Sequence, residues 1–139
     1  MYRKIIVAIA LGGMEKGEKI LRKAASLLDD GGQIVALNVI EDVPTYVAIE
    51  LPANMVEDAM QDSRDQLKAL ITETGIAATV EIRNGPPAKA IISTAESYGA
   101  DLIIVASHVP DFSNYFIGAT ADRVVRHAKC SVLVDRQKV

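Results

Sequence analysis

Hydrophobic residues follow two alternating patterns along the chain. Apolar runs over residues 5–11, 34–40 (interrupted only by Asn38) and 102–105 are typical of strands buried on both faces of a sheet. Residues 132–134 form a shorter run of the same kind. Between residues 78 and 83 apolar and polar side chains alternate, which indicates a strand at the edge of the sheet. The pattern therefore predicts five strands.

Apolar residues at helical spacing fill the segments between these strands. The spacing predicts four helices, and we expect the first to end at Asp29–Gly32 with a glycine in the left-handed conformation. The second should end near Gly75, and Pro87 should begin the third. Strands that alternate with helices favour a parallel sheet covered on both faces. We therefore expect residues 1–139 to form a single three-layer α/β/α domain.

In a sheet of this type, ligands bind beyond the carboxyl ends of the strands, where the strand order reverses. Four connections lie there: Ala10–Gly13, Val39–Asn54, Arg83–Pro87 and Ala106–Thr120. The last of them contains Gly118 at the start of a predicted helix, where free backbone N–H groups and the helix dipole favour a phosphate. The hydroxyl of Thr120 can either cap this helix or donate to a phosphate oxygen.

Composition and charge exclude several classes of function. The net charge is −3 without a basic block, so we do not expect a nucleic-acid partner. No apolar run reaches the ~20 residues of a membrane span, and no signal peptide is visible. Cys130 is the single cysteine, so an intrachain disulfide is ruled out and we expect a cytoplasmic protein.

Motifs for catalysis are absent from the sequence. It contains no phosphate-loop lysine motif, no glycine-rich dinucleotide motif and no nucleophile elbow. We also find no metal-ligand cluster, so neither catalysis nor a Mg²⁺ site is expected.

Several short motifs in the final third of the chain match a known signature. These are Ile104–His108, Pro110–Asp111, Gly118, Val124–Ala128 and Cys130–Val134. Together they resemble the carboxy-terminal signature of universal stress proteins, and they are most similar to the F/G-type branch. Lys4–Ile9, Leu37–Ile40 and Pro44–Tyr46 also fit that branch.

The resemblance implies a five-stranded parallel sheet of order 3-2-1-4-5 and the binding of ATP or AMP. It also implies a homodimer formed through the last strand, at Ser131, Val132, Leu133 and Val134. Carried over to this sequence, the backbone of Val39 would meet the adenine and Ala106 would lie under the ribose. Val109 would take the second small position of the glycine motif, and Gly118, Ala119 and Thr120 would hold the phosphates.

Two further residues of the signature, Ser107 and His108, fall within the expected site. His108 follows a strand end, where two roles are open to it. It either contacts the ribose or phosphate, or it hydrogen-bonds the backbone of its own loop.

The sequence departs from the family pattern at three of these positions. Ala10 stands where the first strand usually ends in an aspartate, and Val109 stands where the F/G-type branch has arginine. Ala119 replaces a serine next to the phosphate glycine. The lost hydrogen bonds would weaken nucleotide binding by roughly 10²- to 10³-fold if nothing compensates.

Two functions therefore follow from the sequence. The first is stress signalling by a protein that binds an adenine nucleotide with little or no hydrolysis. The second is a dimeric interaction module that has lost nucleotide binding, a hypothesis supported by the apolar connection Val43–Leu51.

Overall fold

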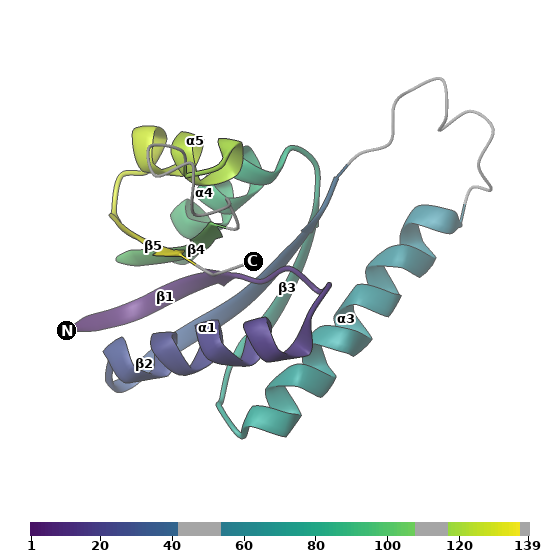
Figure 1. The fold of residues 1–139 in the computed structure, drawn as a ribbon, viewed down its shortest axis with the longest axis horizontal. Helices are drawn as coiled ribbons and strands as arrows, with labels where there is room; N and C mark the ends of the chain where they lie inside the picture. Colours follow the sequence, from purple (N-terminus) through teal and green to yellow (C-terminus); the bar gives the residue numbers. More distant parts are fainter. Residues whose placement is uncertain (42–53, 108–116, 137–139) are drawn as a thin grey trace.

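A computed structural model of the chain describes residues 1–41, 54–107 and 117–136. Strands and helices alternate along these residues, as the hydrophobic pattern predicts (Figure 1). The elements are β1 (Tyr2–Ala8), α1 (Met14–Leu27), β2 (Leu28–Ile40), α3 (Met55–Thr74), β3 (Thr79–Asn84), α4 (Pro87–Tyr98), β4 (Leu102–Ser107), α5 (Ala119–His127) and β5 (Ser131–Arg136).

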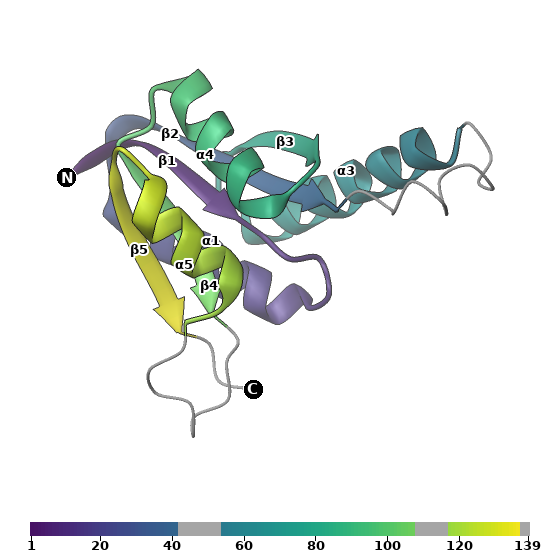
Figure 2. The ribbon, with the colours of Figure 1, turned by 90° about the horizontal axis from the view of Figure 1, so that it is seen from above.

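The five strands form one sheet in the order β3-β2-β1-β4-β5, and every neighbouring pair is parallel. This confirms the predicted fold class and strand order. β1 is central: its Ile5 pairs with Ile34 of β2 on one side and with Leu102 of β4 on the other (Figure 2). β2 and β3 are added on one side of β1, and β4 and β5 are added on its other side. The direction in which successive strands are added therefore reverses between β1 and β4.

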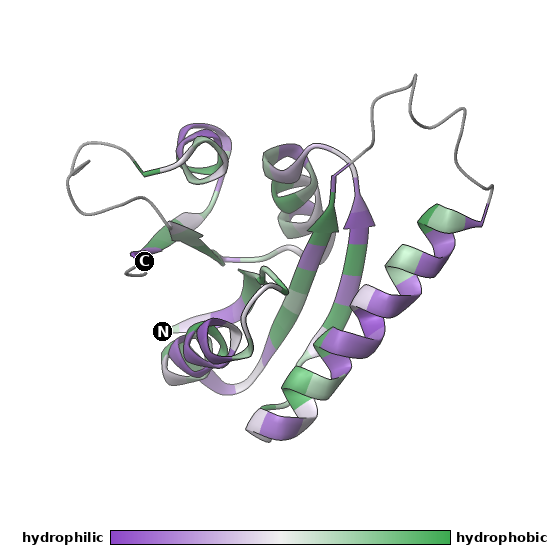
Figure 3. Ribbon diagram, turned by 45° about the vertical axis from the view of Figure 1, so that its right-hand side comes forward, coloured by the Kyte–Doolittle hydropathy of each residue, from purple (hydrophilic) through white to green (hydrophobic). Residues whose placement is uncertain are grey.

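Helices cover both faces of the sheet, and on each face a hydrophobic core lies between the sheet and its helices. α1 and α3 lie on one face, and α4 and α5 lie on the other (Figure 1). Alternate residues of β1 pack into different cores, because successive side chains of a strand point to opposite faces. Ile5 packs with Ile20 and Leu21 of α1, whereas Ile6 packs with Ile91 of α4. Figure 3 shows the apolar strands between helices whose outer faces are polar.

Two predicted helix boundaries are confirmed and one is wrong. α3 ends at Gly75, whose φ of 72° is left-handed, and Pro87 opens α4. α1 ends instead at Leu28, which has extended backbone and leads directly into β2. Leu28 packs against the core, so the chain continues as a strand where a glycine cap was expected.

Fewer residues of α3 and α5 are buried than the helical spacing of apolar residues in the sequence indicated. Only the second half of α3 buries side chains fully, at Leu67 and Leu70, while Val56 is 42% exposed. In Figure 1 the first turns of α3 reach past the sheet, which explains this exposure. On α5, Val125 was expected to face the core but is 48% exposed.

β1 begins and ends three residues before the apolar run 5–11 that predicted it, because it ends at Ala8 and the chain turns before α1. None of the helices in the described part of the chain is both long and apolar enough to cross a membrane.

Candidate functional site

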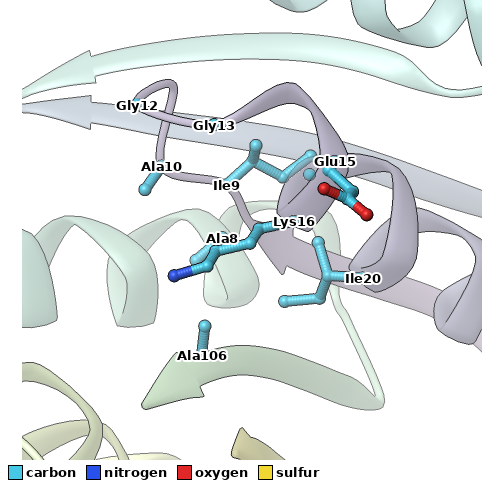
Figure 4. A pocket seen from close by; sticks show the side chains of 10 residues that line it. Ala8, Ile9, Ala10, Gly12, Gly13, Glu15, Lys16, Ile20 and Ala106 are labelled. Carbon is cyan, nitrogen blue, oxygen red and sulfur yellow. The ribbon is translucent and has the colours of Figure 1, made fainter. Parts of the chain in front are cut away.

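A cavity of about 360 Å³ opens at the carboxyl ends of β1 and β4. It lies where the strand order reverses, the place where sheets of this type bind ligands. Its volume falls within the range of small-molecule sites. The lining residues come from β1, the connection to α1, the first turns of α1 and β4, and most are shown in Figure 4: Ala8, Ile9, Ala10, Gly12, Gly13, Glu15, Lys16, Gly17, Ile20 and Ala106.

Small residues keep this cavity open, and apolar residues form its floor. Ala8, Ala10 and Ala106 carry only a methyl group each, so the ends of β1 and β4 leave room between them. Ile9 and Ile20 are 4% and 2% exposed and belong to the core below. The cavity therefore offers an apolar surface suited to a ring system.

The connection from β1 to α1 is held by two hydrogen bonds from β2. The backbone N–H of Ile9 donates to the carbonyl oxygen of Leu37 at 2.8 Å. The side-chain amide of Asn38 donates to the carbonyl oxygen of Ile9 at 2.7 Å. These bonds extend the strand pairing beyond Ala8 and fix the edge of the cavity next to Ala10.

The electrostatic character of the cavity comes from the start of α1. Gly13 precedes the helix with extended backbone, and no side chain caps the first N–H groups. The helix dipole places partial positive charge there. Two charged residues of the first turn, Glu15 and Lys16, also line the cavity.

The structure brings two predicted site residues together. Ala10 and Ala106 line the same cavity from different strands. Ser107 follows Ala106 at the end of β4 and is 4% exposed. Val39 lies near the end of β2, and its side chain packs against the core beneath α4 and α5. Val39 is not among the residues that line the cavity, and the contact of its backbone with an adenine stays a prediction.

The predicted phosphate residues Gly118, Ala119 and Thr120 lie at the start of α5 and are not among the residues that line the cavity. Gly118 is the N-cap and has a φ of 90°, a conformation that favours glycine. Thr120 is therefore in the first turn and does not cap the helix, in contrast to one of the two roles considered for it. His108 and Val109, and the connection Val43–Leu51, lie outside the described residues.

Gly12, Gly13 and Lys16 were missed as individual site residues. The connection Ala10–Gly13 was recognised as a place for a ligand, but Lys16 resembles any exposed lysine on the polar side of a helix. Its position over the cavity depends on how α1 packs on the sheet, which the sequence pattern does not specify.

Two further observations concern the single cysteine and the metal-ligating side chains of the described residues. Cys130 is half-buried, and burial raises the pKa of its thiol, which disfavours the nucleophilic thiolate. Within residues 1–41, 54–107 and 117–136, no three His, Cys, Asp or Glu side chains are grouped to hold a metal ion.

The fold and the cavity define a doubly wound α/β protein with a ligand-sized site at its switch point. Comparison with known proteins assigns the family: the model of the universal stress protein family matches residues 1–136, and the chain belongs to that family. Universal stress protein G of Shigella flexneri is 28% identical and covers 98% of this chain and 100% of its own length, which supports the F/G-type branch. Universal stress protein A homolog 2 of Coxiella burnetii is 30% identical over 99% of this chain and 97% of its own.

Solved structures agree on the fold. The hypothetical protein MJ0577 superposes with a TM-score of 0.78 at 22% identity, covering 100% of this chain and 99% of its own. A universal stress protein solved in complex with cAMP gives a TM-score of 0.57 at 18% identity, with 97% of both chains covered.

Proposed function

We propose that this protein binds an adenine nucleotide, ATP or AMP, in the cavity between β1 and β4, and that its occupied state serves stress signalling in the cytoplasm. The observation that carries the proposal is the cavity itself, which is apolar, about 360 Å³ in volume and located at the switch point of the sheet. Further support comes from the family to which the chain belongs and from a relative of the same fold that was solved with cAMP.

In this proposal the ribose lies over Ala106, and the phosphates reach the start of α5 at Gly118–Thr120. Gly118 is suited to this role because it has no side chain and precedes nine residues of helix. No catalytic role is assigned, and turnover is expected to be absent or very slow.

Equilibrium titration with ATP and AMP tests the proposal. Saturable binding of either nucleotide supports it, and the absence of binding up to millimolar concentration overturns it. Ala106→Leu should abolish binding, because the larger side chain fills the cavity floor. Ala25→Leu makes the same change at an exposed position of α1 that does not line the cavity, and it should bind as the natural protein does.

Thr120→Val tests the phosphate end separately. It removes the hydroxyl with little change in shape and should weaken binding about fivefold, the value of one neutral hydrogen bond. Gly118→Val is a poorer test, because a φ of 90° strains any residue with a side chain and would also destabilise α5.

The alternative function, a dimeric interaction module without a nucleotide, is favoured by one feature. β5 lies at the end of the described sheet and presents three half-buried apolar residues, Val132, Leu133 and Val134. We propose that this strand pairs with a second copy whichever function holds, since an exposed apolar edge invites strand pairing. A nucleotide that remains bound through purification would argue against the alternative.

A further inference from the structure

One charged side chain points into the cavity. Lys16 extends from the first turn of α1, and in Figure 4 its amine is drawn between Ala10 and Ala106, which line the same cavity. Glu15 also lines the cavity, but Figure 4 shows its carboxylate directed away from that amine. Among the described lining residues, Lys16 thus supplies the charge that a ligand between β1 and β4 would meet.

The ammonium group of Lys16 has no partner in the part of the chain that the structure describes. Two other cations of α1 are paired, Arg22 with Glu18 at 2.8 Å and Lys23 with Asp135. Lys16 makes no such ion pair within residues 1–41, 54–107 and 117–136. Binding an anion would therefore cost no existing ion pair among these residues.

The charge of Lys16 and the expected phosphate site at Gly118–Thr120 lie at different places in the fold. Lys16 belongs to α1, which covers one face of the sheet, whereas Gly118–Thr120 begin α5 on the opposite face. The proposed function places the ribose over Ala106, and Figure 4 shows the amine of Lys16 above that residue. The methyl group of Ala10 adds no negative charge that would repel an anion at this point.

We propose that Lys16 selects adenine nucleotides that carry a phosphate on the 2′- or 3′-oxygen of the ribose as well as on the 5′-oxygen. The inference rests on the proposed function, which places the ribose over Ala106. An ammonium group gains much more from a phosphate dianion than from a neutral hydroxyl, because the hydrogen bond is then charge-assisted at both ends.

Affinities for four ligands test this inference: AMP, ADP, adenosine 2′,5′-bisphosphate and adenosine 3′,5′-bisphosphate. At least one bisphosphate should bind about tenfold or more tightly than AMP. ADP carries its additional phosphate at the 5′ end and controls for added charge alone. The two bisphosphates distinguish the 2′ from the 3′ position.

Lys16→Gln should reduce the preference for the bisphosphate to within about twofold, while the ratio of ADP to AMP affinity stays unchanged. Lys19→Gln removes the same charge from an exposed position of α1 outside the cavity and should leave every affinity unchanged. The preference should also weaken with added salt.

The outcomes of these measurements distinguish failure of the inference from failure of the proposed function on which it rests. Binding of AMP with no preference for either bisphosphate would overturn the inference and leave the proposed function standing. An equal loss for ADP and the bisphosphates in Lys16→Gln would also overturn it, because the lysine would then act only through general charge. If none of the four ligands binds, the inference fails, and the proposed function fails with it when ATP does not bind either.

Discussion

The side-chain amide of Asn38 on β2 donates a hydrogen bond of 2.7 Å to the carbonyl oxygen of Ile9, just beyond the end of β1. Ile9 is 4% exposed, so few water molecules can replace this donor. The bond ties the first residue after β1 to the neighbouring strand at the edge of the cavity. The ligand site and the stability of the sheet are therefore linked through one side chain.

Asn38→Ala should lower the free energy of unfolding by about 1–2 kcal/mol, because the carbonyl oxygen of Ile9 loses its side-chain donor. It should also increase hydrogen exchange at Gly12 and Gly13, whose connection it helps to hold. Urea unfolding and amide exchange measure the two effects.

Gln33→Ala is the matched control for this substitution. Gln33 makes an amide hydrogen bond of 3.1 Å to Thr79, but on the exposed surface. Its removal should change stability by less than about 0.5 kcal/mol, since water replaces the partner. Equal effects of the two substitutions would contradict the role given to Asn38.

Gly32 on β2 should not tolerate a side chain. A Cβ atom there would lie 2.7 Å from the backbone oxygen of Arg3 and 2.6 Å from the Cδ1 atom of Leu28. The backbone oxygen cannot move without disturbing β1, so Gly32→Ala should destabilise the fold by about 1–3 kcal/mol in urea unfolding.

Gly12→Ala controls for the loss of a glycine. Nothing lies within 4 Å of a Cβ atom at Gly12, and its φ is not positive. The substitution should therefore leave the unfolding midpoint nearly unchanged. A neutral result at Gly32 would show that β1 and β2 can separate locally without cost.

The sequence predicted the sheet better than the details of its ends. Four apolar runs, one segment of alternating residues and the intervening helical stripes were enough for the fold class, because burial on two faces leaves few other topologies. The glycines after α1 were misinterpreted as a helix cap. Their actual role at Gly32, close approach to the backbone of Arg3, depends on strand packing that local sequence does not encode.

The candidate site was predictable only in part, for the same reason. The rule that ligands bind at strand ends indicated four connections, the family resemblance singled out Ala10 and Ala106 among their residues, and the structure puts both in one cavity. Lys16 and Asn38 carry no local signal, because a lysine on a helix and an asparagine in a strand are common residues. Their roles come from contacts between elements distant in sequence.

Asp101 should make stability depend on acid pH. Burial alone would raise the pKa of its carboxyl group, but the backbone N–H groups of Arg3 and Lys4 donate to it at 2.9 and 3.0 Å and hold the pKa below its ordinary value of 3.8. The folded state then binds fewer protons than the unfolded state. The stabilisation is present above the ordinary pKa and is lost as pH falls through the lowered one.

Asp101→Asn should therefore be less stable than the natural protein by about 1 kcal/mol at pH 7. The difference should shrink as pH falls from about 5 toward 3. Urea unfolding at several pH values measures it.

Asp30→Asn is the control, because it removes a carboxylate that is exposed and has no hydrogen-bond partner among the described residues. Its difference in stability from the natural protein should stay small at every pH. Parallel pH curves for Asp101→Asn and the natural protein would contradict this account.

Pairing of β5 with a second copy should appear as protection of one sheet edge and not the other. β5 and β3 are the two end strands of the described sheet, and each hydrogen-bonds to one neighbour. The middle of β5, Val132–Val134, is apolar and its charges lie at the end of the strand, at Asp135 and Arg136, whereas the middle of β3 carries the paired charges of Glu81 and Arg83 at 3.0 Å. Charged side chains on an edge strand disfavour association, so β5 is the edge expected to pair.

Light scattering at micromolar concentration should give a dimer. On dilution, amide exchange should increase over residues 131–136 and stay constant over residues 79–84. A monomer at micromolar concentration, or a change confined to β3, would show that β5 is not the dimer contact.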